Sequence, residues 1–134
     1  MLKYIIGKEK KIIKKLSREI VNAIAIGNYK IILEKVDDTK NWNIDILSEV
    51  IDCFKEDNDL GEIDSYDVEC TFKPNYKDDS QYIQEDIFTF NDNSGFGYEY
   101  HLTTNGDPND LVLNIEFLFE GEYLKVVFES GITV

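Results

Sequence analysis

The chain has 134 residues, of which 43% are hydrophobic and 31% are charged, and its formal net charge is −13. This length and composition allow one hydrophobic core without disulfides or metals, so we expect a single domain over residues 1–134. Residues 1–40 contain 10 Lys and Arg against 5 Asp and Glu, whereas residues 41–134 contain 4 against 22. The acidic part excludes nucleic acid, a polyanion, as the expected partner.

Membrane insertion and secretion are not expected either. No apolar run approaches the roughly 18 residues of a membrane span, so we expect no membrane partner. The short apolar start precedes the lysines, which is the reverse of the order in a secretory signal. The two cysteines are too few for a disulfide framework. These features predict a cytoplasmic protein.

The first half of the chain has helical periodicity. Apolar residues recur every three or four positions from Lys8 to Ile26, with lysines on the opposite side, and Gly27-Asn28 is a helix stop. A short second helix is expected from Tyr29 to Val36. Asn43 is expected to cap a third helix, which ends in the acidic stretch 56–61.

After Gly61 the period changes to two, which is typical of strands. We expect strands over Tyr66–Phe72, Tyr82–Phe90 and Tyr98–Thr104. The turn-rich stretches 91–97 and 105–110 separate these strands and the last hairpin.

The last hairpin can be assigned a register. A two-residue turn at Glu120-Gly121 places apolar residues opposite one another and Glu116 opposite Lys125. In this register the expected pairs are Phe119 with Glu122, Phe117 with Leu124, Ile115 with Val126, and Leu113 with Phe128. We expect this apolar face to pack under the first helix.

The order of elements predicts an α+β fold, with a helical part over residues 1–60 and an antiparallel sheet of about five strands over 61–134. The stretch 20–29, a helix ending in a Gly-Asn-Tyr turn, resembles the opening of NTF2-like domains. The stretch 109–128 is similar to the end of small uncharacterised bacterial domains of that kind. The chain thus resembles the cone-shaped NTF2-like and cystatin-like superfamilies, which include immunity proteins of bacterial toxin systems.

The only histidine offers an alternative, enzymatic reading. NTF2-like enzymes place His, Asp and Tyr inside the cone, so the resemblance implies that His101 with Glu99 would be the candidate base. Strand alternation puts both residues on one face and Tyr98 and Tyr100 on the other. A pair of polar residues on one strand face is typical of the solvent side, so we expect no catalytic role for His101.

Cysteine and metal chemistry are not expected. Cys53 lies beside Val50 and Phe54 on the expected third helix, and Cys70 lies between Val68 and Phe72 on the expected strand. Both are therefore predicted to lie in the core as small hydrophobic side chains. The acidic run over 52–69 does not have the ligand spacing of an EF-hand loop. We therefore expect neither a metal nor a cofactor.

Protein binding is the function that the charge favours. Carboxylates alternate with tyrosines in the middle of the chain, and such surfaces attract and hold basic partners. The candidate partner-binding residues are Asp57, Asp59, Glu62, Asp64, Tyr66, Asp78, Asp79, Tyr82, Glu85 and Asp86. We expect a non-enzymatic protein that binds a basic partner, most specifically an immunity protein that occludes a basic toxin domain. The alternative is an NTF2-like enzyme or small-ligand-binding domain, and the oligomeric state stays open.

Overall fold

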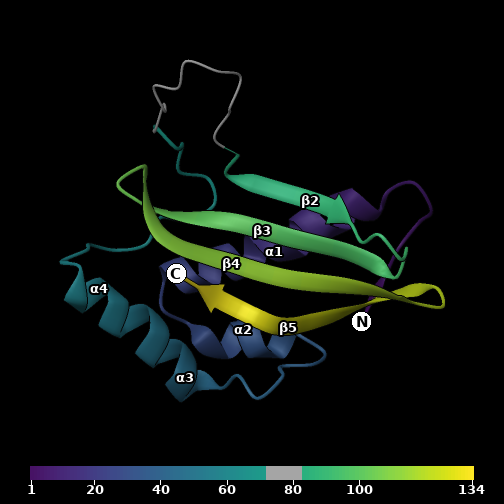
Figure 1. The fold of residues 1–134 in the computed structure, drawn as a ribbon, viewed down its shortest axis with the longest axis horizontal. Helices are drawn as coiled ribbons and strands as arrows, with labels where there is room; N and C mark the ends of the chain where they lie inside the picture. Colours follow the sequence, from purple (N-terminus) through teal and green to yellow (C-terminus); the bar gives the residue numbers. More distant parts are fainter. Residues whose placement is uncertain (72–82) are drawn as a thin grey trace.

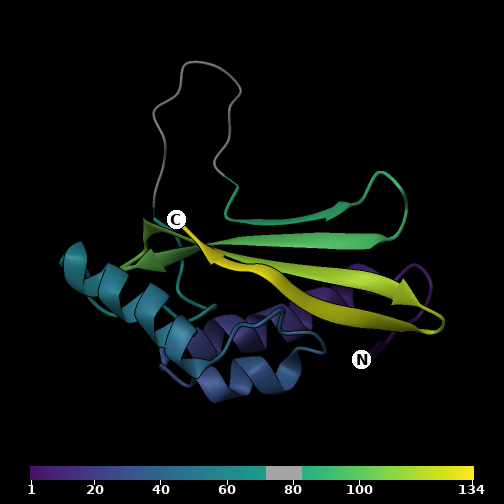
Figure 2. The same ribbon diagram turned by 60° about the horizontal axis from the view of Figure 1, so that its bottom comes forward.

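The protein consists of a helical layer on one face of a five-stranded antiparallel sheet (Figures 1 and 2). The structure, a computed structural model, describes residues 1–71 and 83–134. The helices are α1 (Glu9–Ala25), α2 (Tyr29–Lys35), α3 (Ile44–Ser48), the π-helical stretch η1 (Glu49–Cys53) and α4 (Phe54–Asp57). The strands are β1 (Leu2–Lys3), β2 (Glu85–Thr89), β3 (Gly95–Thr104), β4 (Asp107–Glu120) and β5 (Tyr123–Thr133), in the sheet order β1-β5-β4-β3-β2. The predicted α+β class is confirmed.

The helices follow the sequence pattern closely. α1 buries its apolar stripe, including Ile13, Ile20 and Ile24, and leaves its lysines exposed. α3, η1 and α4 follow one another without a break. At the start of α3 the Asn43 side chain accepts a hydrogen bond from the Ile46 backbone N–H at 2.9 Å, which confirms the expected cap.

The core lies between the helices and the inner face of the sheet. Its largest buried side chains are Tyr98 on β3, Phe117 on β4 and Phe128 on β5. They belong to a single core cluster that also contains the buried isoleucines of α1 and α2. Successive side chains of a strand point to opposite faces, so every second residue of each strand lies on the helix-free face of the sheet.

The β4–β5 hairpin has the predicted faces but a different register. Phe117 pairs with Val126, and Glu120 pairs with Tyr123, so the turn residues are Gly121 and Glu122. Gly121 has a φ of +61°, which a two-residue turn requires at its first position and which glycine adopts readily. The predicted pairing is therefore wrong by two residues, and Glu116 faces Val127. Because strand side chains alternate with a period of two, the same residues remain buried.

The free edge of β5 is covered by two segments that are distant in sequence. β1 pairs with the start of β5, and beyond it the Asp37 and Asp38 N–H groups donate to the Val126 carbonyl at 2.9 and 3.1 Å. The Asp37 carboxylate in turn accepts the Val126 N–H at 2.7 Å. These contacts satisfy backbone groups that an open sheet edge would expose.

Three strand predictions need correction. Residues 66–71 of the expected strand Tyr66–Phe72 form turns and irregular backbone, and β1 supplies the fifth strand instead. β3 begins at Gly95, inside the stretch expected to be a loop. The break expected over 105–110 is confined to Asn105-Gly106, because Asp107 already pairs with Thr104.

The cysteine prediction is wrong for Cys53, which is exposed, whereas Cys70 is partly buried. Cys53 ends the π-helical stretch, in which hydrogen bonds span five residues instead of four. The sequence placed it in the core because it lies beside Val50 and Phe54, but those two side chains are themselves only partly buried. Among the described residues, no helix combines the length and apolarity that crossing a bilayer would demand.

Candidate functional site

The most elaborate polar arrangement lies where β2 meets β3 beneath α1. Glu85 pairs with Tyr100 across the sheet, and Ile87 pairs with Tyr98. Directly paired residues point to the same side, so Glu85 faces the helical layer together with both tyrosines. This pairing brings a carboxylate into an otherwise aromatic part of the core.

Glu85 is held by two hydroxyl groups and one cation. Its Oε2 accepts a hydrogen bond from the Tyr98 hydroxyl at 2.7 Å, and its Oε1 accepts one from the Tyr66 hydroxyl at 3.1 Å. The Lys14 Nζ lies 3.4 Å from Oε1, and the Glu85 side chain is only 16% exposed. A carboxylate this far removed from water needs such partners to offset its lost hydration.

Three tyrosine rings form a stack beside this carboxylate. The Tyr66 and Tyr100 centroids are 5.6 Å apart, and those of Tyr98 and Tyr100 are 6.4 Å apart with an interplanar angle of 2°. Gln84 Nε2 donates to the Tyr100 hydroxyl at 3.2 Å. Stacking and hydrogen bonding fix the orientation of the rings.

Tyr66 is positioned by α1, although it lies in an irregular segment. Its backbone N–H donates to Asn22 Oδ1 at 2.8 Å. The Arg18 guanidinium carbon lies 5.8 Å from the centroid of the Tyr66 ring, and an Arg18 nitrogen lies 3.1 Å from Asp67 Oδ2. One arginine therefore has an aromatic face and a carboxylate as partners.

The two tyrosines that donate to Glu85 remain protonated at neutral pH. Burial, followed by the hydrogen bond to Glu85 and its negative charge, raises the pKa of Tyr66 to about 12. The same causes, with burial again first, raise the pKa of Tyr98 far above its ordinary value. Both hydroxyl groups are therefore hydrogen-bond donors and not bases near pH 7.

An open hollow adjoins this stack, and we call it the acidic hollow. Its lining residues are Tyr66, Asp67, Val68, Glu69, Cys70, Gln84, Glu85 and Tyr100. The lining combines aromatic faces with three carboxylates and contains no histidine. Such a surface suits a lysine or arginine side chain, and Arg18 already shows this type of contact.

The structure brings together only some of the predicted partner-binding residues. Tyr66 and Glu85 meet in the acidic hollow. Asp86 follows Glu85 and therefore points to the opposite, helix-free face, where it pairs with Glu99. Asp78, Asp79 and Tyr82 lie outside the described residues.

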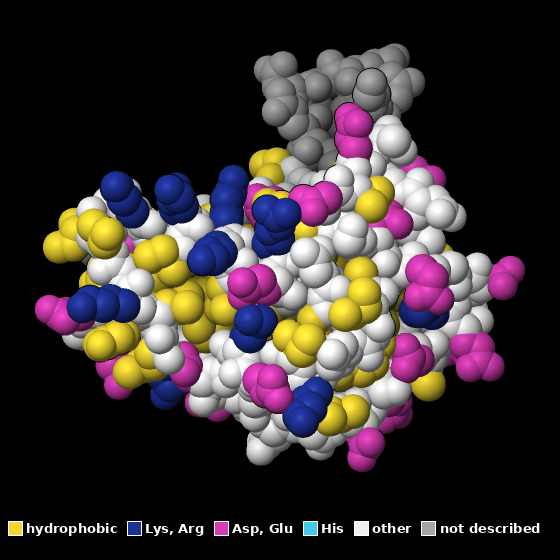
Figure 3. Space-filling model, turned by 180° about the vertical axis from the view of Figure 1, so that it is seen from behind, with side chains coloured by type: hydrophobic (Ala, Val, Ile, Leu, Met, Phe, Trp, Pro, Cys, Tyr) yellow, Lys and Arg dark blue, Asp and Glu magenta, His cyan; other side chains and the backbone are white. Residues whose placement is uncertain are grey.

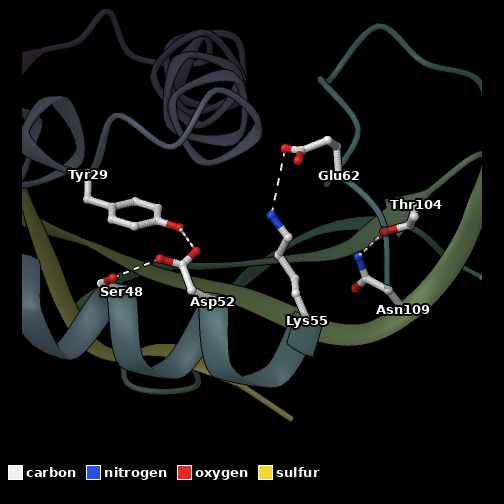
Figure 4. A network of polar contacts seen from close by, with 7 residues as sticks. All are labelled: Tyr29, Ser48, Asp52, Lys55, Glu62, Thr104 and Asn109. Carbon is white, nitrogen blue, oxygen red and sulfur yellow. Dashed lines mark hydrogen bonds and ion pairs between the residues drawn. The ribbon is translucent and has the colours of Figure 1, made fainter. Parts of the chain in front are cut away.

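The other four predicted residues lie elsewhere. Asp57 and Asp59 are exposed at the end of α4. Glu62 lies 3.6 Å from the Lys55 Nζ, in the region of the Tyr29–Asp52–Ser48 hydrogen bonds (Figure 4). The Asp64 carboxylate anchors the β3–β4 turn by accepting hydrogen bonds from the Thr103 hydroxyl and from the Asn105 and Gly106 N–H groups. The predicted set is therefore not one continuous surface.

Several residues in the hollow or directly beside it were not in that set. Lys14 and Arg18 belong to the helix face that the sequence assigned to solvent, and Tyr100 was noted only as a strand tyrosine. Asp67 and Glu69 lay within the acidic run, but nothing distinguished them from its other carboxylates. The β2–β3 pairing was the missing information, because it determines which residues meet Glu85.

His101 and Glu99 do not take part in the acidic hollow. They alternate with the buried Tyr98, Tyr100 and Leu102, so they belong to the helix-free face of β3. Glu99 instead lines a small pocket there with Phe88 and Glu116. Burial first, and then the charge of Glu129, raise the pKa of Glu116 against the opposing effect of Lys40.

No cluster of three or more His, Cys, Asp or Glu side chains suited to a metal ion occurs in residues 1–71 and 83–134. The family model of a domain of unknown function, DUF7668, matches residues 21–134. The chain belongs to this family. Neither a curated protein nor a solved structure matches the chain significantly.

The DUF7668 match includes the whole lining of the acidic hollow but not its cationic neighbours. Tyr66, Glu85 and Tyr100 lie within the matched range, whereas Lys14 and Arg18 precede it. The matched range therefore contains the aromatic and acidic lining, and the part of α1 before it supplies the cations that neutralise part of that charge.

Proposed function

We propose that the protein is a non-enzymatic binding domain whose acidic hollow receives a lysine or arginine side chain of a basic protein. The observation that carries this proposal is the composition of the hollow, in which aromatic faces stand beside Asp67, Glu69 and Glu85. A cation over a tyrosine ring is attracted by the ring quadrupole, and a neighbouring carboxylate adds charge and hydrogen bonds. Arg18 makes both contacts within the chain.

The hollow retains negative charge after its internal pairs are formed. Lys14 pairs with Glu85, and Arg18 pairs with Asp67. Glu69 is exposed and makes no ion pair within the described part of the chain. It is therefore the carboxylate that remains for a partner.

The surrounding charge favours the same class of partner. Residues 41–134 carry 22 Asp and Glu against 4 Lys and Arg. Such an excess accelerates association with a basic protein, while buried aromatic contacts slow its dissociation. The narrower hypothesis is an immunity protein that occludes a basic toxin domain. It rests on the sequence resemblance to NTF2-like and cystatin-like domains, which include immunity proteins of bacterial toxin systems.

The enzymatic alternative has less support. It requires His101 and Glu99 inside one pocket. Strand alternation assigns both residues to the helix-free face, where Glu99 lines a pocket whose lining does not include His101. The hydroxyl groups beside Glu85 are protonated donors, so they offer no base. Binding therefore accounts for more of the geometry than catalysis does.

A basic peptide tests the proposal without knowledge of the natural partner. We expect a fluorescent oligoarginine peptide to bind at low salt, and RNA of similar length not to bind. Glu69→Lys should weaken peptide binding several-fold more than Asp59→Lys, because both variants change the net charge equally but only Glu69 lines the hollow. Equal losses in the two variants would contradict the proposal, since they would indicate unselective attraction to an acidic surface.

A further inference from the structure

The connection between β1 and α1 is an ordered turn with an apolar apex. The Lys8 N–H donates to the Ile5 carbonyl at 2.9 Å, and Gly7 has a φ of +87°. The Gly7 N–H also donates to the Glu9 carboxylate at 2.8 Å. Ile5 and Ile6 are 64% and 89% exposed, although the turn that carries them is hydrogen-bonded. Two adjacent isoleucines are thus held in solvent by defined backbone contacts.

Several exposed lysines lie close to this turn in the sequence. Lys3, Lys8, Lys10, Lys11 and Lys15 are exposed. None of them forms an ion pair in the described parts of the chain, although the protein has 27 carboxylates. We call Lys3, Ile5, Ile6, Lys8, Lys10 and Lys11 the basic tip. Figure 3 shows hydrophobic side chains at one end of the molecule beside a row of Lys and Arg.

The position of the basic tip separates it from the acidic helix end. The β1–α1 turn lies at one end of the long axis and α4 at the other (Figure 1). Asp57 and Asp59 are at the α4 end. Charges separated by more than a Debye length of about 8 Å are largely screened at physiological ionic strength, so the net charge of the chain does not prevent an anionic surface from approaching the tip.

We infer that the basic tip docks on an anionic lipid surface, with Ile5 and Ile6 entering the headgroup region and the lysines contacting acidic headgroups. Exposed apolar side chains bordered by lysines are the combination that binds peripheral proteins to such membranes. A fluid bilayer accepts two isoleucines without a preformed pocket, whereas a protein partner would have to provide one. The sequence-based expectation of no membrane partner concerned a spanning segment and did not consider this tip.

Nearby carboxylates weaken the attraction between the basic tip and an anionic lipid surface. Glu120 and Glu122 are exposed on the β4–β5 hairpin, and the Glu122 carbonyl accepts the Tyr4 N–H beside the turn at 3.3 Å. Their charge opposes that of the lysines. We therefore expect binding that needs both the isoleucines and the lysines and that weakens with salt.

Vesicle co-sedimentation of the full chain tests the inference. Vesicles of phosphatidylcholine with phosphatidylserine should bind the protein at low salt, and vesicles of phosphatidylcholine alone should not. Replacing both Ile5 and Ile6 with Ser should weaken binding by about tenfold or more. The matched control is Ile26→Ser, because Ile26 is 74% exposed at the other end of α1 and its loss should have no effect.

A second pair of variants tests the contribution of the lysines to vesicle binding. Lys10→Gln should weaken binding by about fivefold, which corresponds to one basic residue near an anionic surface. Lys30→Gln removes the same charge from α2 and should change binding little. Absence of binding to the mixed vesicles, or equal binding to pure phosphatidylcholine, would overturn the inference. Undiminished vesicle binding by the double isoleucine variant would overturn it in favour of purely electrostatic attraction by the lysines. Self-association that this variant abolishes would overturn it in favour of a second copy of the chain.

Discussion

The acidic hollow and the basic tip use the same helix in opposite ways. Lys10, Lys14 and Arg18 are spaced four residues apart on α1, so they form one row along its surface. Lys14 and Arg18 pair with Glu85 and Asp67, whereas Lys10 has no ion-pair partner within the described residues. One row of like charges therefore has ion-pair partners at one end and none among the described residues at the other.

The largest expected effect concerns the core that supports both regions. Phe117 is completely buried on β4, within the cluster that joins the sheet to α1. Phe117→Ala should lower the free energy of unfolding by about 3–5 kcal/mol, because it leaves a cavity as well as removing apolar contacts. Urea denaturation measures this change. A loss comparable to that of an exposed position such as Phe119→Ala would show that Phe117 is not a core residue.

The next largest loss of stability is expected on one face of β2 and not on the other. Glu85→Ala should lower the free energy of unfolding by about 1–3 kcal/mol, because the buried Tyr98 hydroxyl then loses its acceptor. Asp86→Ala removes the same charge from the adjacent residue, which points away from the helices. That variant should stay within about 0.5 kcal/mol of the wild-type protein. If the two losses were equal, the polar network around Glu85 would not contribute to stability.

Alkaline pH should weaken the tyrosine stack. An unfolded tyrosine has a pKa near 10, and the folded Tyr66 has a pKa of about 12. The protonated hydroxyl is therefore favoured by folding, so its contribution is complete below about pH 10 and is lost as the pH rises through about 12. Tyr98 shifts in the same direction.

We expect the unfolding free energy of Tyr66→Phe to fall less steeply than that of the wild type between about pH 10 and 12. Tyr123→Phe, at a position outside the acidic hollow, is the control and should follow the wild-type profile. Parallel pH profiles for all three proteins, measured by urea denaturation, would argue against the contact between Tyr66 and Glu85.

The smallest effect on stability is expected at the basic tip. Replacing Ile5 and Ile6 with Ser should change the free energy of unfolding by no more than about 0.5 kcal/mol, because both side chains are exposed. The melting temperature provides the measurement. A clear loss of stability would mean that the isoleucines serve the fold, and the tip would then resemble the hollow instead of contrasting with it.

The sequence patterns predicted which face of an element is buried better than they predicted which residues contact one another. The period of the β4–β5 hairpin identified its buried residues, but the register depended on Gly121 taking the first turn position. Cys53 was assigned to the core because of its apolar neighbours Val50 and Phe54, which are themselves only partly buried. Of the candidate site, Tyr66 and Glu85 were predicted, whereas Tyr100 and Arg18 depend on contacts between segments far apart in the chain.

The central claim is that the acidic hollow, and not acidity in general, recognises basic chains. Backbone amide chemical shifts during titration with oligoarginine test it most directly. We predict that the largest shifts occur at Tyr66, Glu69 and Tyr100 and that they diminish as salt is added. Shifts concentrated at Asp57 and Asp59 on the α4 end, with none around the hollow, would contradict the claim.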